Sequence, residues 1–142
     1  MSLSAEQRVR YQRQVLLPEI GDRGQAALCE ARFVVAPAEG ADAGRVDPRA
    51  AQTAVDYLTR AGMHPAAPST RGGAVVVGVA SSGDVARIAS GRPELEPAAA
   101  ALLGALSAAE AMKAVVGAGR PMSPTAAPAL AAAPPSTGPE ER

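Results

Sequence analysis

Aromatic side chains are scarce in this sequence of 142 residues, which has no Trp, one Phe and two Tyr. Hydrophobic residues make up 47% of the chain, and many of them are alanines. Because aromatic rings bury more apolar area per residue than aliphatic side chains do, the core must be built from Val, Leu, Ile and Ala. We therefore expect a domain of marginal stability that a partner or self-association would stabilise.

Cysteine and histidine occur once each, as Cys29 and His64. A single thiol excludes an intrachain disulfide, and one Cys with one His cannot form a Cys-rich zinc site. We expect Cys29 on the apolar side of an early helix, where a thiol packs as a small hydrophobic group. We expect His64, which precedes a proline, in a solvated loop, because a ligand or a catalytic base requires several partners.

The chain also lacks an excess of charge of either sign, with 14 basic and 14 acidic residues spread along it. It therefore has no overall field that would attract nucleic acid or an anionic membrane. We see no N-terminal basic and apolar signal pattern, and no apolar run near the ~20 residues that span a bilayer. The expectation is a cytoplasmic protein that binds neither nucleic acid nor membrane.

Two helices are predicted before the first strand. Ser4 caps the first, with Gln7 completing a capping-box pattern, and this helix should run to about Leu16, before a proline. Asp22 is the expected cap of the second helix, which ends near Ala31.

The middle of the chain alternates between predicted strands and helices. Asp47 and the proline after it form a helix start in which both the cap and the first helical position are favourable. The expected elements, in order, are a strand at 32–36, a helix at 48–61, a strand at 74–79, a short helix from the 81–84 turn to 90, and a long helix at 97–117.

Residues 122–142 are mostly Pro, Ala, Ser, Thr and Gly with a charged end. Such a segment cannot bury enough apolar surface to offset its ordering entropy, so we predict that it is disordered. The predicted fold is a shortened α/β Rossmann-like domain at 32–121, with an N-terminal helical pair at 1–31 and this tail. A small sheet leaves an edge or a face uncovered, which favours an oligomer.

The stretch from Arg10 to Gln25 reads RYQRQVLLPEIGDRGQ. It resembles the start of the ThiF/MoeB/HesA family, adenylyltransferases related to ubiquitin-activating enzymes, which open with Arg-Tyr-x-Arg-Gln, Leu-Pro-Glu-Ile-Gly and Gly-Gln before a strand. Residues 57–62 are similar to the end of that family's first crossover helix, and 104–121 to its late helix. The resemblance implies a ThiF-type fold, ATP with magnesium, and adenylyl transfer to a ubiquitin-like or sulfur-carrier protein.

The sequence departs from the family at the nucleotide loop. Where the family has Gly-x-Gly-Gly-x-Gly, residues 36–44 read APAEGADAG, which retains only Gly40 and Gly44. Such loops need closely spaced glycines so that backbone N–H groups can approach phosphate. Pro37 removes a donor and two acidic residues add negative charge. We therefore predict that the usual mode of phosphate binding is lost.

A second, weaker nucleotide candidate is the 81–84 turn, which follows a strand and precedes a helix. Ser82 and Gly83 are its candidate ligands, through hydroxyl and amide groups. The alternative is helix capping by Ser82 or Asp84, which most helices of this kind use.

Residues 63–94 contain none of the catalytic parts that the resemblance implies, namely an acidic residue for the ribose, an Arg/Lys pair, an Asp for magnesium and Cys-x-x-Cys pairs. We therefore expect no metal site, no resident cofactor and no autonomous catalysis.

One family residue keeps its context. The second arginine of Arg-Tyr-x-Arg-Gln, which in the family contacts ATP phosphates of the other subunit, is Arg13 here. The resemblance thus suggests a pseudoenzyme that lends Arg13 to an intact relative in a heterodimer, or that forms a homodimer. The alternatives are that Arg13 is an ordinary surface residue, that the chain is a self-associating scaffold, or that a nucleotide still binds weakly at the strand ends.

Overall fold

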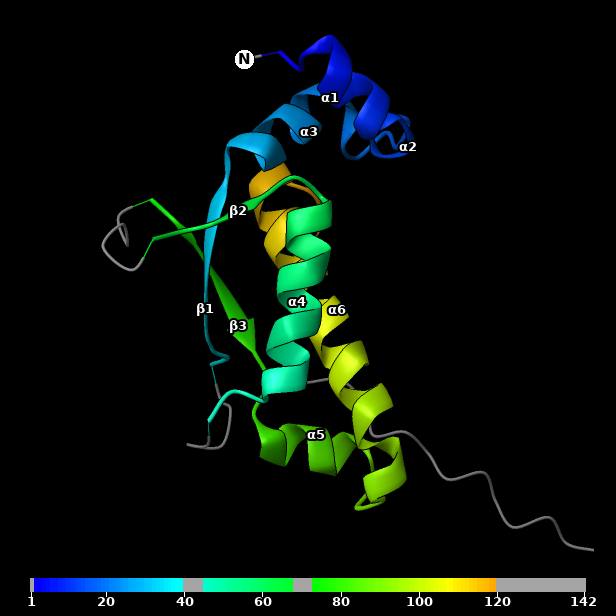
Figure 1. The fold of residues 1–142 in the computed structure, drawn as a ribbon, viewed down its shortest axis with the longest axis vertical. Coiled ribbons are helices and arrows are strands. Elements are labelled where there is room, and N and C mark those ends of the chain that lie inside the picture. Colours follow the sequence, from blue (N-terminus) through cyan, green and yellow to red (C-terminus); the bar gives the residue numbers. More distant parts are fainter. Residues whose placement is uncertain (1, 40–44, 68–72, 120–142) are drawn as a thin grey trace, which may run out of the picture.

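The computed structural model describes residues 2–39, 45–67 and 73–119, and the predicted tail lies outside them. The elements are α1 (Ala5–Arg10), α2 (Gln12–Val15), α3 (Gly21–Glu30), β1 (Arg32–Pro37), α4 (Pro48–Arg60), β2 (His64–Pro65), β3 (Val75–Val79), α5 (Ser82–Ile88), the 3-10 turn η1 (Pro93–Leu95) and α6 (Glu96–Val116) (Figure 1). Strands and helices alternate along the middle of the chain, which makes this a small α/β fold.

The three strands form a parallel sheet in the order β2-β1-β3. The expectation that His64 lies in a loop was wrong, because His64 begins β2 and its N–H donates to the Ala31 carbonyl at 3.0 Å. Ala66 N–H donates to the Phe33 carbonyl at 2.8 Å. This strand has no hydrophobic run to reveal it. Pro65 is tolerated there because β2 lies at the sheet edge, where a missing N–H breaks no ladder.

One face of the sheet carries the core. Phe33 pairs with Val75 and Val35 pairs with Val77, so the four side chains share a face. Phe33 and Val77 are buried, and α4 and α6 lie side by side against this face (Figure 1). On the opposite face Val76 is 66% exposed. Parallel sheets are normally covered on both faces, whereas within the described ranges this face remains partly open at Val76.

Helices α4 and α6 approach each other closely at Gly104. A Cβ there would overlap the Ala50 carbonyl oxygen and would lie 2.7 Å from Thr53 Cβ. The small residue lets the two backbones meet, with Leu58 and Leu103 buried in the same core. The sequence had indicated the bounds of both helices to within one residue.

The first predicted helix is interrupted. The Ser4–Gln7 capping box is confirmed, but the chain forms α1 and α2 with a break at Tyr11 instead of one helix to Leu16. The Tyr11 ring is buried against Gly62, where an added Cβ would lie 3.1 Å from the Tyr11 hydroxyl. Gly62 has a φ of +103°, which a side chain would strain as well. Anchoring of Tyr11 at the end of α4 accompanies the change in helix direction.

The expected cap at Asp22 was also wrong. Helix α3 begins at Gly21 after Ile20 and has no side-chain cap. Its first N–H group, that of Gly21, instead donates to the Leu17 carbonyl in the preceding turn at 2.9 Å. Asp22 instead accepts a hydrogen bond from Arg8 Nε at 3.0 Å, which ties α1 to α3.

Helix α6 is the longest element of the described residues, and it ends at Gly117, as predicted. Gly117 itself adopts the left-handed conformation. Glu110 pairs with Lys113 on this helix at 2.7 Å. By length and composition alone, Pro93–Val116 is apolar enough to cross a membrane. The expectation of no such run was wrong, because the alanines between the leucines raise the mean hydropathy. In this fold α6 packs against α3, α4, α5 and β3.

Candidate functional site

The carboxyl ends of β1 and β3 meet at one edge of the sheet, where α4 and α5 begin. Ala38 N–H donates to the Val79 carbonyl, and Asp47 N–H donates to the Ala80 carbonyl, both at 3.0 Å. The second bond joins the cap of α4 to the residue before the cap of α5. Ligands of α/β proteins bind at this edge, so the polar residues here form the first candidate site.

Asp47 is the centre of this site. Its carboxylate accepts the N–H groups of Arg49 at 2.9 Å and Ala50 at 3.2 Å, which confirms it as the α4 cap. It also accepts from the Arg49 guanidinium at 3.0 Å and from Ser82 Oγ at 3.0 Å. The side chain is 1% exposed. Asp47 therefore joins the start of α4 to the start of α5.

Electrostatics keep this carboxylate charged. Burial by itself raises the pKa of Asp47 and is the largest single influence. Hydrogen bonds from the Arg49 side chain, Ala50 N–H, Ser82 and Arg49 N–H together outweigh it, so the pKa lies below the ordinary value. Arg49 also pairs with Glu96 at 3.1 Å, and its two acidic partners raise its own pKa. The sequence signalled Asp47 as a cap but gave no sign of these long-range contacts.

The 81–84 turn forms a cap, but through Ser81 and not through Ser82. Ser81 Oγ accepts Asp84 N–H at 3.2 Å, and Asp84 Oδ2 accepts Ser81 N–H at 3.0 Å. Ser82 is the first residue of α5, and its hydroxyl donates to Asp47. Gly83 is the next residue and is exposed. The candidate ligands Ser82 and Gly83 therefore lie beside an acidic side chain.

The described residues at this edge do not fit a triphosphate with magnesium. The N-terminus of α4, which would face an anion, already binds the carboxylate of Asp47, and a second negative charge there would be repelled. No group of three His, Cys, Asp or Glu within the described ranges is placed to hold a metal ion. Gly40 and Gly44, the other candidate ligands, lie outside the described residues. The hydrogen bonds around Asp47 instead join α4 to α5, which is a structural role.

A second site combines the single cysteine and the single histidine. A pocket of about 410 Å³ is lined by residues of α1, α3 and β2 and of the links between elements, namely Ser4, Glu6, Gln7, Arg10, Tyr11, Cys29, Gly62 and His64. Cys29 is half-buried, and Gln25 Nε2 lies 3.6 Å from its sulfur. Cys29 lies on an early helix, as predicted, and Tyr11 lines the same pocket. Cys29 and His64 lie far apart in the sequence, which gave no sign of this pocket.

Arg13 lies on α2 and is not among the residues that line the second pocket. Its side chain is exposed, and no ion pair of Arg13 occurs within the parts of the chain that the structure describes. The nearest exposed apolar residues in the sequence are Val9 at 73% and Leu16 at 80%. We refer to residues 5–16, which comprise α1, α2 and the C-cap residue Leu16, as the N-terminal arm. It presents a cation and apolar side chains to solvent.

No family model, curated protein or solved structure matches this chain.

Proposed function

We propose that this chain is a degenerate member of the ThiF/MoeB/HesA family that acts as a non-catalytic partner or regulator of an intact adenylyltransferase. Its domain would be a shortened, ThiF-type Rossmann-like unit. The RYQRQVLLPEIGDRGQ stretch from Arg10 to Gln25 supports the family. The parallel order β2-β1-β3, with β1 between the other two strands, fits one part of a doubly wound sheet.

The residues at the carboxyl edge of the sheet support the proposal that this chain is not catalytic. An adenylyltransferase must neutralise a triphosphate there. In this chain the Asp47 carboxylate fills the start of α4, and Arg49, the nearest cation, is already paired with Asp47 and Glu96. A bound phosphate would have to compete with both carboxylates for Arg49.

The role of a partner rests on Arg13, whose exposure without an ion pair in the described structure is the observation that carries the proposal. A guanidinium presents several donors in a fixed plane and suits phosphate oxygens of a nucleotide held elsewhere. Val9 and Leu16, which are strongly exposed on the same arm, fit contact with a protein. The arm would therefore dock on the intact enzyme and place Arg13 at its ATP phosphates, while that enzyme activates a ubiquitin-like or sulfur-carrier protein.

The test measures ATP–pyrophosphate exchange by an intact adenylyltransferase of this family, from the same cell, with and without the chain. We expect the wild-type chain to raise the exchange rate. The stimulation by the Arg13→Ala chain should be smaller by at least about tenfold, because the lost phosphate contact no longer stabilises the transition state. Arg60→Ala on α4, another exposed arginine, is the matched control and should keep the full effect. If Arg13→Ala and Arg60→Ala act alike, Arg13 does not serve the partner.

A further inference from the structure

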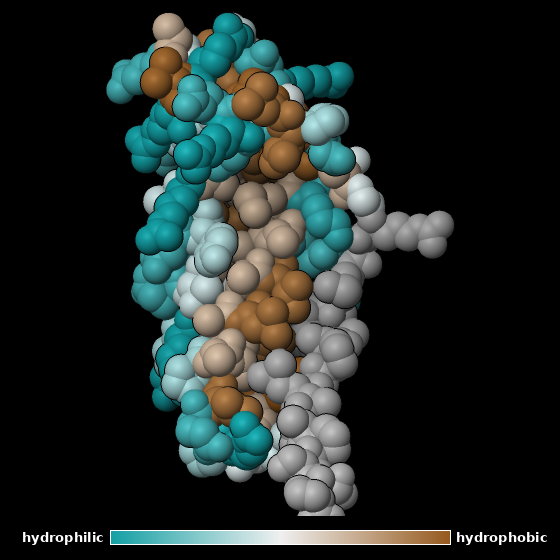
Figure 2. Space-filling model, turned by 90° about the vertical axis from the view of Figure 1, so that its right-hand side faces the viewer, coloured by the Kyte–Doolittle hydropathy of each residue, from teal (hydrophilic) through white to brown (hydrophobic). Residues whose placement is uncertain are grey.

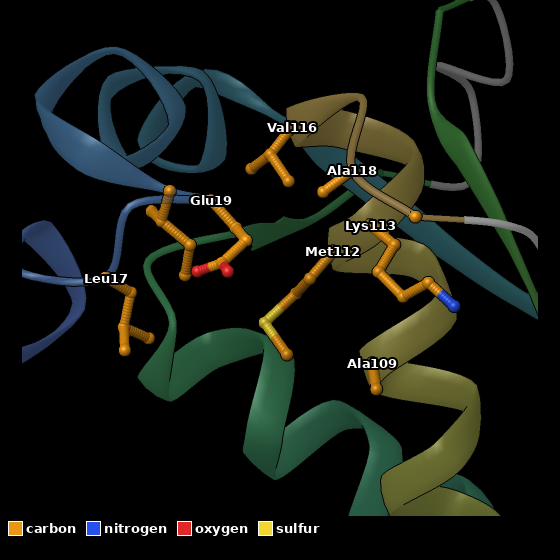
Figure 3. Close-up of a pocket in the computed structure, with 9 residues that line it drawn as sticks. Leu17, Glu19, Ala109, Met112, Lys113, Val116 and Ala118 are labelled. Carbon is orange, nitrogen blue, oxygen red and sulfur yellow. The ribbon is translucent and has the colours of Figure 1, made fainter.

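Two hollows of similar size in the described structure differ in the chemistry of their walls. One is a pocket of about 360 Å³ beside α6, and its lining includes Leu17, Ile20, Met112 and Val116. Figure 2 shows a stripe of apolar side chains along one side of the molecule, and Figure 3 shows Met112 reaching from α6 toward the segment that carries Leu17. Such walls offer few polar groups by which to select the chemistry of a ligand.

The second pocket, of about 410 Å³, is lined by polar and ionisable groups instead. It brings together the thiol of Cys29 on α3, the imidazole of His64 on β2, and the side chains of Glu6 and Arg10 on α1. The chain has one cysteine and one histidine, and the fold places both in this wall. A volume of this order is in the range of about 300–1,000 Å³ that is typical of small-molecule sites.

The sulfur of Cys29 has a defined place in the wall. Gln25, which is fully buried, donates from Nε2 to Cys29 Sγ at 3.6 Å and to the Ala61 carbonyl at 2.8 Å. A Cβ added to Gly62 would lie 3.0 Å from Cys29 Sγ and 3.1 Å from the Tyr11 hydroxyl. The sulfur therefore borders the same glycine as the Tyr11 hydroxyl. Cys29 is only half-buried, so a reagent in the pocket can reach it.

The pocket also carries charges of both signs. The Arg10 guanidinium lies over the Tyr11 ring, 5.6 Å from its centroid, a stacked position that leaves its N–H groups able to bind a carboxylate. Arg10 forms no ion pair with any residue in the described ranges. Glu6, on the same helix, supplies a negative charge. A ligand that has both a carboxylate and an ammonium group matches this wall better than an apolar ligand does.

We propose that the second pocket is a modification site, at which Cys29 forms a mixed disulfide with a small peptide thiol that carries carboxylate and ammonium groups, as glutathione does. The Cys29 thiolate attacks one sulfur of the corresponding peptide disulfide. A new S–S bond forms as the old one breaks, and the released half leaves as a thiolate that takes up the proton lost by Cys29. Arg10 binds a carboxylate of the attached half, and Glu6 binds its ammonium group.

This site goes beyond the proposed function and does not depend on it, because neither Arg13 nor ATP takes part. The attached peptide would contact both α1 and β2, whose residues line the pocket. It would therefore join the N-terminal arm to the edge of the sheet.

The first test compares two disulfides as reagents for the full chain at neutral pH, with mass spectrometry to follow the adduct. They are glutathione disulfide and hydroxyethyl disulfide, which is smaller and uncharged. Each rate is divided by the rate for the same chain unfolded in urea, which removes the reactivity of the reagent itself. We expect the folded chain to favour glutathione disulfide by at least about fivefold, the gain from one close charge pair in water. Equal relative rates, or a folded chain that reacts with neither reagent, overturn the proposal.

The second test locates this preference in the pocket. Arg10→Gln should lower the preference for glutathione disulfide about fivefold, whereas Arg10→Lys, which keeps the charge, should retain most of it. Arg23→Gln is the matched control and should keep the full preference, because Arg23 is exposed on α3 and is not among the pocket-lining residues. An Arg10→Gln chain that behaves like Arg23→Gln overturns the assignment. The first test requires no variant, so it holds even where Arg10→Gln loosens the packing on Tyr11.

Discussion

At the scale of single residues, Asp47 connects more of the fold than any motif in the sequence suggests. One carboxylate caps the N-terminus of α4, orients the Arg49 side chain and accepts a hydrogen bond from the Ser82 hydroxyl. Its burial would be unfavourable without these partners, because an unpaired charge in the interior is strongly destabilising. The helix cap and the contact between α4 and α5 therefore depend on the same group.

Replacement of this carboxylate should show its contribution as a function of pH. Asp47→Asn keeps an acceptor for the cap but loses the ion pair with Arg49, and we expect it to lower the free energy of unfolding at pH 7 by about 1–2 kcal/mol. The folded pKa of Asp47 lies below its ordinary value of 3.8. The carboxylate therefore stabilises the fold fully above the unfolded pKa, and this stabilisation is lost as the pH falls through the folded pKa.

Urea unfolding of the wild type and of Asp47→Asn between pH 7 and pH 3 measures this effect. The difference in the free energy of unfolding between the wild type and Asp47→Asn should stay constant down to about pH 5 and shrink below about pH 4. Asp22→Asn is the control, because the Arg8–Asp22 pair is more than half exposed at both side chains. It should change the free energy of unfolding by less than about 0.5 kcal/mol. A difference for Asp47→Asn that persists unchanged to pH 3 would exclude the carboxylate charge as the cause.

At the scale of elements, the contact between α4 and α6 depends on the absence of a side chain. Helix propensity alone would make Gly104→Ala stabilising by about 1 kcal/mol. The structure predicts the opposite sign, because the new methyl would overlap the Ala50 carbonyl and push α6 from α4. We expect a loss of about 1–3 kcal/mol in the free energy of unfolding, as for other overpacked cores.

Denaturation of Gly104→Ala beside Ala101→Gly checks this prediction. Ala101 is exposed on α6, and its replacement by glycine should lower stability by about 1 kcal/mol through propensity only. A stabilised Gly104→Ala would mean that α4 and α6 are not in close contact at this position.

Elements with a local signal could be predicted from the sequence, and those set by distant contacts could not. Asp47 followed by proline announces α4, and the apolar run before Ala80 announces β3, because caps and hydrophobic runs act within a few residues. The break at Tyr11 depends on Gly62 at the far end of α4. Strand β2 exists only because β1 lies beside it. Asp47 bonds to Ser82, 35 positions away, and the second pocket brings Cys29 together with His64. Sequence spacing reveals neither contact.

At the scale of the whole molecule, the core is small and largely aliphatic, while three apolar surfaces of the described residues remain at least partly exposed. They are the face of the sheet that bears Val76, the side of α6 that bears Leu102, and the N-terminal arm. Stability alone would favour covering them, since exposed apolar patches of this kind mark interaction surfaces. The chain has no net charge to keep copies apart. These features fit the association with a partner that we propose.

The carboxyl edge of the sheet predicts how the melting temperature of the isolated chain responds to nucleotide. A ligand that binds the folded state at 100 times its Kd stabilises it by about 2.7 kcal/mol, which would raise Tm by several degrees in a domain of this size. Because the Asp47 carboxylate already fills the start of α4, we expect no increase in Tm beyond about 1 °C with millimolar ATP and magnesium. Magnesium sulfate at equal ionic strength is the control for salt effects. A rise of several degrees with ATP alone would contradict this prediction and would favour nucleotide binding by this chain itself, with Gly40 and Gly44 as the first residues to substitute.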